Sequence, residues 1–227
     1  MKRNLTITAI LLVFLISCNT HTSDLKIGEN NTIPTIDRSL AMKPPMGWNS
    51  WDCLGFDVNE EDVKATADYM AKKLNDLGYE YIVLDMNWYA AEGPAGADIV
   101  SPPYNMDEYG RLIPDTVKFP SSKGGRGFKP LADYVHSLGL KFGIHILGGI
   151  PKKAVAADCL IKGTSNHASS ITQPEIGGYR YPTFHAIDLT KPGGQDYYNS
   201  IFELYASWGV DYIKADYLPL DSELIGI

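Results

Sequence analysis

The stretch YASWGVDYIKAD, residues 205–216, joins the end of an apolar helix pattern to a glycine and then to an apolar strand that closes on an Asp. The same order occurs in LNDLGYEYIVLD, residues 74–85, and in VHSLGLKFGIHI, residues 135–146. Helices that alternate with buried strands in this way are typical of a parallel α/β array. Such arrays carry their polar chemistry at the carboxyl ends of the strands. The three stretches therefore predict the fold class and the location of the functional residues together.

The expected array has four strands and three helices in strict alternation. The strands are expected within residues 46–51, 79–84, 140–146 and 210–215. Asn59 is expected to cap the first helix, whose apolar residues recur in steps of three and four until Gly78 ends it. The second helix is expected to begin at Pro130, and the third to span about 195–208. Since a (β/α)8 TIM barrel has eight such units, the chain is predicted to hold about the first four of them.

Two long segments interrupt this alternation. Residues 90–128 are rich in Gly and Pro, and residues 148–190 carry His167 and His185. Segments of this length without a helix or strand pattern are usually functional loops. Both segments are therefore predicted to be loops.

The composition excludes some classes of partner. The 227 residues include 44% hydrophobic residues and carry a net charge of −7, with an isoelectric point near 5.2. Nucleic-acid binding needs a basic face, so no nucleic-acid partner is expected. A mean hydropathy of −0.14 is ordinary for a globular protein, and the length is sufficient for one domain with a sizeable core.

The N-terminus has the features of an export signal. Lys2 and Arg3 precede an apolar run at residues 7–16, which is too short to span a bilayer. The run ends in Leu-Ile-Ser before Cys18, which resembles the lipobox of bacterial lipoproteins. The resemblance implies that Cys18 is lipidated and becomes the mature N-terminus. An ordinary signal peptide with a coincidental Cys is the alternative.

This signal divides the chain into three predicted parts. Residues 1–18 are a lipoprotein signal peptide, residues 19–40 a flexible tether, and residues 41–227 a partial (β/α) barrel. The expected location is that of an exported bacterial lipoprotein, held on the periplasmic or cell-surface side of a membrane only by its lipid anchor. Cys53 and Cys159 lack metal-ligand spacing and are expected to be buried thiols, with a disulfide as the alternative.

The last predicted strand ends in a pair of charged residues that could take part in catalysis. Lys214 and Asp216 are two residues apart, so their side chains project from the same face of a strand. A Lys beside an Asp lowers the pKa of the carboxyl group and keeps it ionised as a nucleophile. A structural salt bridge, or a cap on the next helix, explains this pair equally well when it is taken alone.

Other polar and aromatic residues stand at the remaining strand ends. Asp85 follows a wholly apolar run, where a buried charge requires a hydrogen-bonding partner such as a polar ligand or a loop. Trp48 and Trp51 offer either a surface for sugar stacking or core packing, and His145 is either a site residue or a satisfied core histidine. A barrel brings these strand ends to one pocket, where acidic groups and aromatic walls suit a sugar and paired carboxylates suit glycoside hydrolysis. No cluster with metal-ligand spacing is visible, so neither a metal nor a cofactor is expected.

Five blocks occur in an order that resembles the catalytic barrel of family 27 glycoside hydrolases, the melibiase-type α-galactosidases. They are PPMGWNSW, YEYIVLDMNW, GRLIPDTVKFP, LADYVHSLGLKFGIH and WGVDYIKAD. The resemblance implies a retaining enzyme that hydrolyses terminal α-D-galactosyl linkages, with Asp216 as the catalytic nucleophile. It implies that Lys214 and Asp85 hydrogen-bond galactose hydroxyls and that Trp48 forms a wall of the pocket. His145 is predicted to contact the carbohydrate substrate as well.

The chain departs from the family pattern in two ways that bear on function. Met86 stands where the family usually has a second Asp, which favours an alternative: an α-glycosidase of the same superfamily that acts on glucose or arabinose units. The family takes its acid/base Asp from a later strand, and the residues after Asp216 are not expected to supply it. The chain is therefore predicted to be an incomplete or inactive form of the enzyme. A non-catalytic glycan-binding lipoprotein and a partial gene product without function are further alternatives.

Overall fold

A computed structural model describes residues 42–90, 104–173 and 183–216. Internal contacts divide the chain into two units, residues 1–42 and residues 43–227, and the second unit contains every helix and strand described. The predicted signal peptide, the tether and Cys18 lie outside the described residues. Among the described residues, no helix has both the length and the apolar character needed to cross a bilayer.

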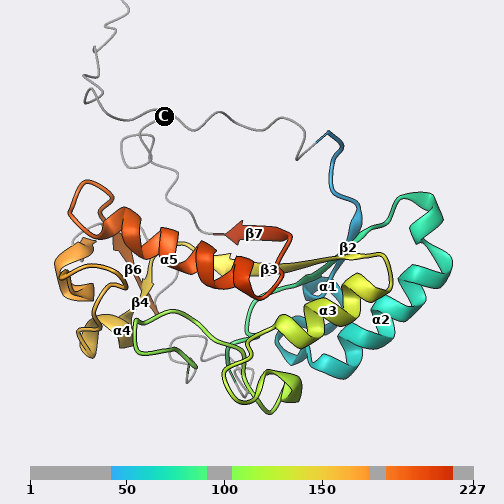
Figure 1. The fold of residues 1–227 in the computed structure, drawn as a ribbon, viewed down its shortest axis with the longest axis horizontal. Coiled ribbons are helices and arrows are strands. Elements are labelled where there is room, and N and C mark those ends of the chain that lie inside the picture. The colour runs from blue at the N-terminus through green and yellow to red at the C-terminus, as the bar shows by residue number, and fades with distance from the viewer. Residues whose placement is uncertain (1–41, 91–103, 174–182, 217–227) are drawn as a thin grey trace, which may run out of the picture. The chain divides into compact units, whose positions relative to one another are not determined.

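The second unit is built on a four-stranded parallel sheet, as the sequence predicts (Figure 1). The strands, in their order across the sheet, are β1 (Gly47–Asn49), β2 (Tyr81–Leu84), β3 (Lys141–Leu147) and β7 (Tyr212–Asp216). All three pairings are parallel, and each strand lies beside the next one of this set along the chain. This arrangement confirms the α/β fold and agrees with the first four units of a (β/α)8 barrel.

Helices connect the successive strands of this sheet. They are α2 (Glu60–Lys73), α3 (Lys129–Ser137) and α5 (Gly194–Ser207). The Asn59 side chain accepts hydrogen bonds from the backbone N–H groups of Glu61 and Asp62, which confirms the predicted cap. Helix α2 ends at Lys73, earlier than the sequence predicts. A 3₁₀ turn, η2 (Asn75–Leu77), follows it and tightens the chain before Gly78, which has a left-handed φ of 90°.

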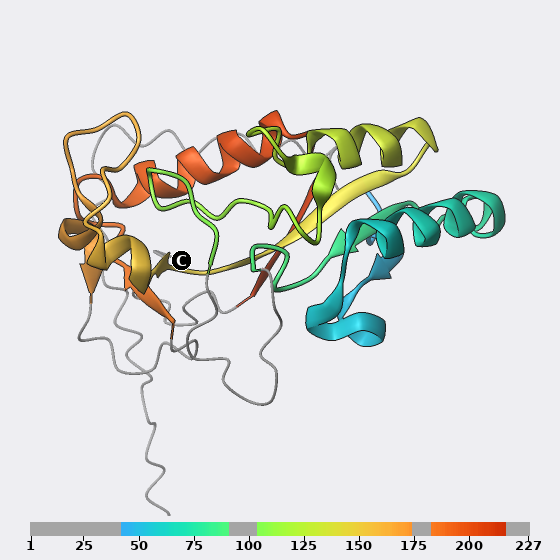
Figure 2. The same cartoon turned by 90° about the horizontal axis from the view of Figure 1, so that it is seen from below.

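The two faces of the sheet have different chemistry. The face toward the helices is apolar and buried, and it carries Ile82, Leu84, Phe142, Ile144 and Ile146. The ring of Phe142 meets Phe128, at the start of α3, with centroids 5.5 Å apart. Figures 1 and 2 show α3 and α5 on this same side of the sheet. The alternate residues of the strands therefore project from the opposite face, which corresponds to the interior of a barrel.

Glycines shape that interior face near the amino ends of the strands. The rings of Tyr81 and Tyr212 meet edge to face, with centroids 5.5 Å apart, although β3 lies between their strands. Gly143 of β3 is paired in register with Val83 and Tyr212, and a Cβ there would lie 3.1 Å from a Val83 methyl carbon and from the Tyr212 carbonyl oxygen. At Gly47 a Cβ would lie 2.0 Å from the Tyr81 carbonyl oxygen. Side chains at these two positions would separate the strands that the site depends on.

The prediction of a loop over residues 148–190 is wrong in the part that the structure describes. This segment forms a small antiparallel sheet in the order β4-β6-β5, with β4 (Ile150–Pro151), β5 (Thr172–Gln173) and β6 (Phe184–Ile187), and the helix α4 (Lys152–Ala156). His185 lies in β6 opposite Ile150, whereas His167 lies beside Asp158. Two of these strands, β4 and β5, have only two residues, which is too short for an alternation of apolar and polar residues to mark them.

Several short elements also have no counterpart in the predicted array. They are α1 (Trp51–Leu54) and the 3₁₀ turns η1 (Gly55–Asp57), η3 (Pro120–Ser122) and η4 (Ala168–Ile171). Cys53 lies in α1 and is exposed, which corrects the expectation of a buried thiol, because the four-residue helix α1 buries none of its residues. Cys159 is partly buried, and both thiols are free.

Candidate active site

The carboxylate of Asp85 lies at the end of β2 and accepts hydrogen bonds on both oxygens. Its Oδ1 accepts the backbone N–H of Met86 at 2.7 Å. Its Oδ2 accepts the side-chain amide of Asn49 at 2.8 Å and the ammonium group of Lys214 at 2.7 Å. Burial opposes ionisation, but these hydrogen bonds outweigh it and hold the pKa of Asp85 below its usual range. The side chain is only 3% exposed, so Asp85 is a buried and firmly held anion.

The ammonium group of Lys214 bridges two carboxylates. Besides Asp85, its Nζ contacts Oδ2 of Asp216 at 2.9 Å. Burial lowers the pKa of Lys214, but the two carboxylates outweigh this effect and raise it. The strand alternation that the sequence suggests is therefore present, since Lys214 and Asp216 project from one face of β7 and interact directly.

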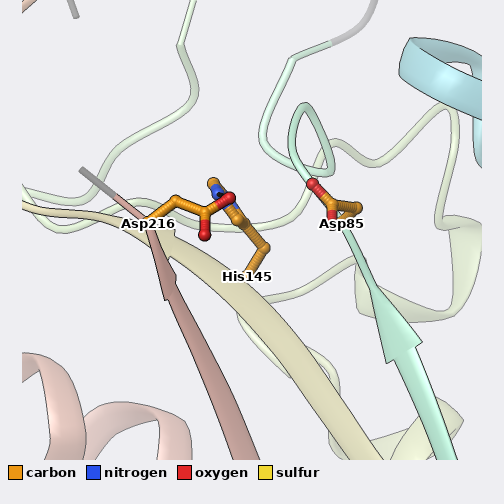
Figure 3. Close-up of side chains that lie close together, drawn as sticks. All are labelled: Asp85, His145 and Asp216. Atoms are coloured by element: carbon orange, nitrogen blue, oxygen red, sulfur yellow. Dashed lines mark ion pairs between the residues drawn. The ribbon is translucent and has the colours of Figure 1, made fainter. Parts of the chain in front are cut away.

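His145 lies near the end of β3, the strand between β2 and β7. Its backbone is paired in register with Lys214, and its Nε2 lies 3.2 Å from Oδ2 of Asp216. Figure 3 shows the imidazole ring beside the Asp216 carboxylate, with Asp85 at the end of the neighbouring strand β2. The indole N–H of Trp88 donates to the His145 carbonyl at 2.9 Å. Burial lowers the pKa of His145 and outweighs the two nearby carboxylates, so the buried position favours the neutral ring.

The two carboxylates of the site differ in a way that decides their roles. Both donors to Asp216, from Lys214 and His145, converge on its Oδ2. Within the described residues no donor contacts its Oδ1, and the side chain is 37% exposed. A nucleophile requires an accessible oxygen with a free lone pair, and Asp216 has one where Asp85 has none exposed.

The main chain of Asp216 is tied to the segment that follows β3. The backbone N–H of Gly148 donates to the Asp216 carbonyl at 3.0 Å, and the N–H of Gly149 donates to the hydroxyl of Tyr198 at 2.7 Å. Tyr198 lies in α5, which leads into β7. The position of Asp216 therefore depends on the start of the small antiparallel sheet as well as on the parallel one.

The two tryptophans at the end of β1 lie in different places. Trp48 packs against the buried core and also lines the hollow that Lys214 borders, so its predicted place in the wall of the sugar pocket stays a prediction. Trp51 begins α1, is 37% exposed, and meets Phe56 edge to face at 4.8 Å. Trp51 is the more exposed of the two.

An open hollow of about 160 Å³ lies on the interior face of the sheet. Residues of β1, β2 and β7 line it, among them Trp48, Asn49, Val83, Tyr212 and Lys214. The ammonium group of Lys214 thus belongs both to the carboxylate cluster and to the wall of the hollow. A small polar ligand in this space would meet a cation and an amide.

Asp85, His145 and Asp216 present one nitrogen and two oxygen atoms within 4.8 Å of one another, a donor set that a divalent cation could use. However, the ammonium group of Lys214 already lies in contact with both carboxylates. The cation that neutralises this cluster is therefore a side chain of the chain itself. The geometry favours an acid–base or sugar-binding site over a metal site.

Two residues that sequence reasoning missed hold Asp85 in place. Asn49 donates to Asp85 and accepts the backbone N–H of Trp51 at 2.9 Å, so one amide links the carboxylate to the start of α1. The hydroxyl of Ser50 accepts the backbone N–H of Asp85 at 2.9 Å. One signal in the sequence could have indicated Asn49: strand alternation places it on the same face as Gly47, which is the interior face of the sheet.

The acid stability of the fold should depend on Asp85. Because its folded-state pKa lies below the reference value of 3.8, its ionised form stabilises the fold at higher pH, and this contribution is lost as the pH falls below 3.8 toward the folded-state pKa. Urea unfolding of the wild type and of Asp85→Asn should give a difference in unfolding free energy that is constant at neutral pH and shrinks below about pH 4. Asp133→Asn, which changes an exposed carboxylate on α3, is the control. A difference that does not change with pH would contradict this assignment.

Comparison with known proteins agrees with the geometry. The sequence model of the family described as Alpha galactosidase A matches residues 43–157. The α-galactosidases of Cyamopsis tetragonoloba and Coffea arabica are 34% and 35% identical to this chain, over 79% and 78% of its length. These matches cover 31% and 33% of the two plant proteins, so the chain spans about a third of the length of the curated relatives it matches.

A solved structure extends this likeness to the fold. The GH27 β-L-arabinopyranosidase of Geobacillus stearothermophilus, in complex with arabinose, has a TM-score of 0.72 and 51% sequence identity to the chain. The match covers 78% of this chain and 41% of that one. Since the family model alone covers half of the sequence, the chain belongs to the alpha galactosidase A family, the melibiase-type glycoside hydrolases of family 27.

Proposed function

We propose that this protein is a retaining glycoside hydrolase that acts on terminal α-D-galactosyl linkages, with Asp216 as its nucleophile. The proposal rests on one observation: the two carboxylates that contact the ammonium group of Lys214 differ in burial and in hydrogen bonding. Asp85 is buried with both oxygens engaged, whereas Oδ1 of Asp216 has no hydrogen-bond donor among the residues that the structure describes and the side chain is 37% exposed. Membership of the family supports the same assignment.

The proposed reaction proceeds in two displacements. Oδ1 of Asp216 attacks the anomeric carbon, the bond to the leaving oxygen breaks as that oxygen takes up a proton, and a glycosyl ester forms with inverted configuration. Water then attacks the same carbon and gives up a proton, the ester bond breaks with its electron pair returning to the carboxylate, and the sugar leaves with its original configuration. Lys214 and His145 hold Oδ2 of the carboxylate throughout. Among the described residues, Asp85 and Asp216 are the carboxylates that contact this cluster, so no residue is assigned to the acid/base role.

Free hydrogen-bonding capacity in the same cluster supports sugar binding. An ammonium group has three N–H donors, and Lys214 uses two of them on Asp85 and Asp216. The third is left for a sugar hydroxyl. Oδ1 of Asp85 accepts one bond, from Met86, and retains a second lone pair for a hydroxyl donor.

A second candidate substrate is a β-L-arabinopyranoside. This sugar has the ring configuration of an α-D-galactopyranoside and lacks only the exocyclic hydroxymethyl group. Met86, directly after Asp85, offers a thioether where a carboxylate could bind a hydroxyl. The relative at 51% identity is a β-L-arabinopyranosidase, which supports this alternative.

We also propose that the protein is exported and lipidated at Cys18. The basic start, the short apolar run and the Leu-Ile-Ser-Cys ending support this. Mass spectrometry of the mature protein should find a diacylated N-terminal Cys18, and Cys18→Ser should remain unlipidated. An unmodified N-terminus elsewhere would refute the proposal.

The nucleophile can be tested with a reagent that needs no proton donor. 5-Fluoro-α-D-galactopyranosyl fluoride releases fluoride with its electron pair as the carboxylate oxygen bonds to C1. We expect one fluorogalactosyl adduct on Asp216 by intact-mass and peptide analysis, no adduct in Asp216→Asn, and a normal adduct in Asp133→Asn. Near-ultraviolet circular dichroism would check that the variants are folded. An adduct on Asp85, persistence in Asp216→Asn, or no adduct in the wild type would overturn the assignment.

The sugar can be tested by a ratio of two rates. Release of 2,4-dinitrophenolate is measured from the α-D-galactopyranoside and from the β-L-arabinopyranoside. Because a carboxylate can bind the hydroxymethyl group, Met86→Asp should shift the ratio toward the galactoside by about tenfold. Met86→Leu, the apolar control, should leave the ratio unchanged. If Met86→Asp also leaves it unchanged, residue 86 does not select the sugar.

A further inference from the structure

The imidazole of His145 is held in an unusual environment. Its side chain is 1% exposed, its Nε2 lies 3.2 Å from Oδ2 of Asp216, and its Nδ1 is buried with no hydrogen-bond partner among the described residues. A buried polar atom without a partner is uncommon and calls for an explanation. The explanation depends on which of the two ring nitrogens carries a proton.

The proton positions follow from the partners. A carboxylate only accepts hydrogen bonds, so the Nε2 that faces Asp216 carries a hydrogen. A second hydrogen, on Nδ1, would create a buried cation with an unpaired N–H beside the ammonium group of Lys214. The charged groups that face the ring are Asp85 from β2 and Lys214 with Asp216 from β7. The ring is therefore the neutral Nε2–H tautomer.

A single donor would leave the Asp216 carboxylate free to turn. The Lys214 ammonium is shared with Asp85 and stands on a flexible four-carbon stem, so it can follow either oxygen of Asp216. The imidazole is planar and buried, and its own strand is fixed by pairing to both neighbours and by the indole of Trp88. A second, rigid donor on the same oxygen fixes the rotation of the carboxylate.

We propose that His145 is a positioning residue for the proposed hydrolysis: as a neutral Nε2–H donor it holds Oδ2 of Asp216 together with Lys214 and so presents Oδ1 to the sugar. The inference rests on the proposed function and assigns His145 a part in it other than contact with the substrate. It accounts for the unpaired Nδ1, because directing Nε2 at the carboxylate leaves Nδ1 as an unprotonated nitrogen with no hydrogen to donate.

The first test is spectroscopic and does not depend on activity. Long-range ¹H–¹⁵N spectra of the histidine-labelled full chain contain five rings, and comparison with His145→Gln identifies the ring of His145. We expect a protonated Nε2 and an unprotonated Nδ1 across the neutral pH range. The opposite tautomer, or a ring with both nitrogens protonated at pH 7, would overturn the proposal.

The second test uses the rate of labelling of Asp216 by the galactosyl fluoride. Gln places an amide N–H near the position of Nε2, whereas Leu has no donor. His145→Leu should lower the limiting rate constant roughly tenfold to a hundredfold, with little change in the half-saturating concentration, and His145→Gln should recover most of the loss. Equal losses in Gln and Leu, or none in either, would refute a positioning role. If the wild type shows the predicted tautomer but no labelling, the proposed function fails and the hydrogen bond to Asp216 stands.

Discussion

The site is organised by one ammonium group between two carboxylates. Lys214 reaches from β7 across β3 to Asp85 on β2, and on the way contacts Asp216. Two carboxylates so close together would repel one another, and a buried one would lose its charge, without a cation to compensate them. The position of that cation depends on the parallel register, which sets Lys214 directly opposite His145. The pairing of the strands, the packing of the helices behind them and the glycines at their amino ends all serve to keep this register.

The contrast between the two carboxylates arises from their surroundings and not from their chemical type. Asp85 is buried and receives donors from β1, β7 and its own following residue, on both of its oxygens. Asp216 stands at the last described position of β7, is partly exposed, and receives both of its described donors on Oδ2. A buried carboxylate held through both oxygens suits binding, and an accessible one held through a single oxygen suits attack. The same residue type thus takes two parts within one cluster.

Much of this arrangement could be predicted from the sequence, because it depends on patterns that repeat within one element. The apolar steps of α2, the cap at Asn59 and the i, i+2 spacing of Lys214 and Asp216 are local and were correctly interpreted. The role of Asn49 could not be predicted, since it depends on the register between β1 and β2. The small antiparallel sheet was not predicted for a different reason: two of its three strands, β4 and β5, have only two residues and show no periodic pattern. The oxygen of Asp216 that accepts the described hydrogen bonds is set by contacts among β2, β3 and β7, so only the tertiary structure shows it.

The segment after β3 differs from an ordinary surface loop in one respect. Its first residues donate hydrogen bonds to the carbonyl of Asp216 through Gly148 and to the hydroxyl of Tyr198 through Gly149, so it is linked to the strand that carries the proposed nucleophile and to the helix before that strand. In a barrel, substrate preference is commonly altered by exchanging the segments that follow the strands. Here such an exchange would change both the substrate preference and the position of Asp216, because a segment that leaves β3 at another angle would shift the backbone of Asp216. Under the proposed function, variation in this segment is thus constrained by the position of Asp216 as well as by recognition, and a graft from a relative should retain the paired glycines at its start.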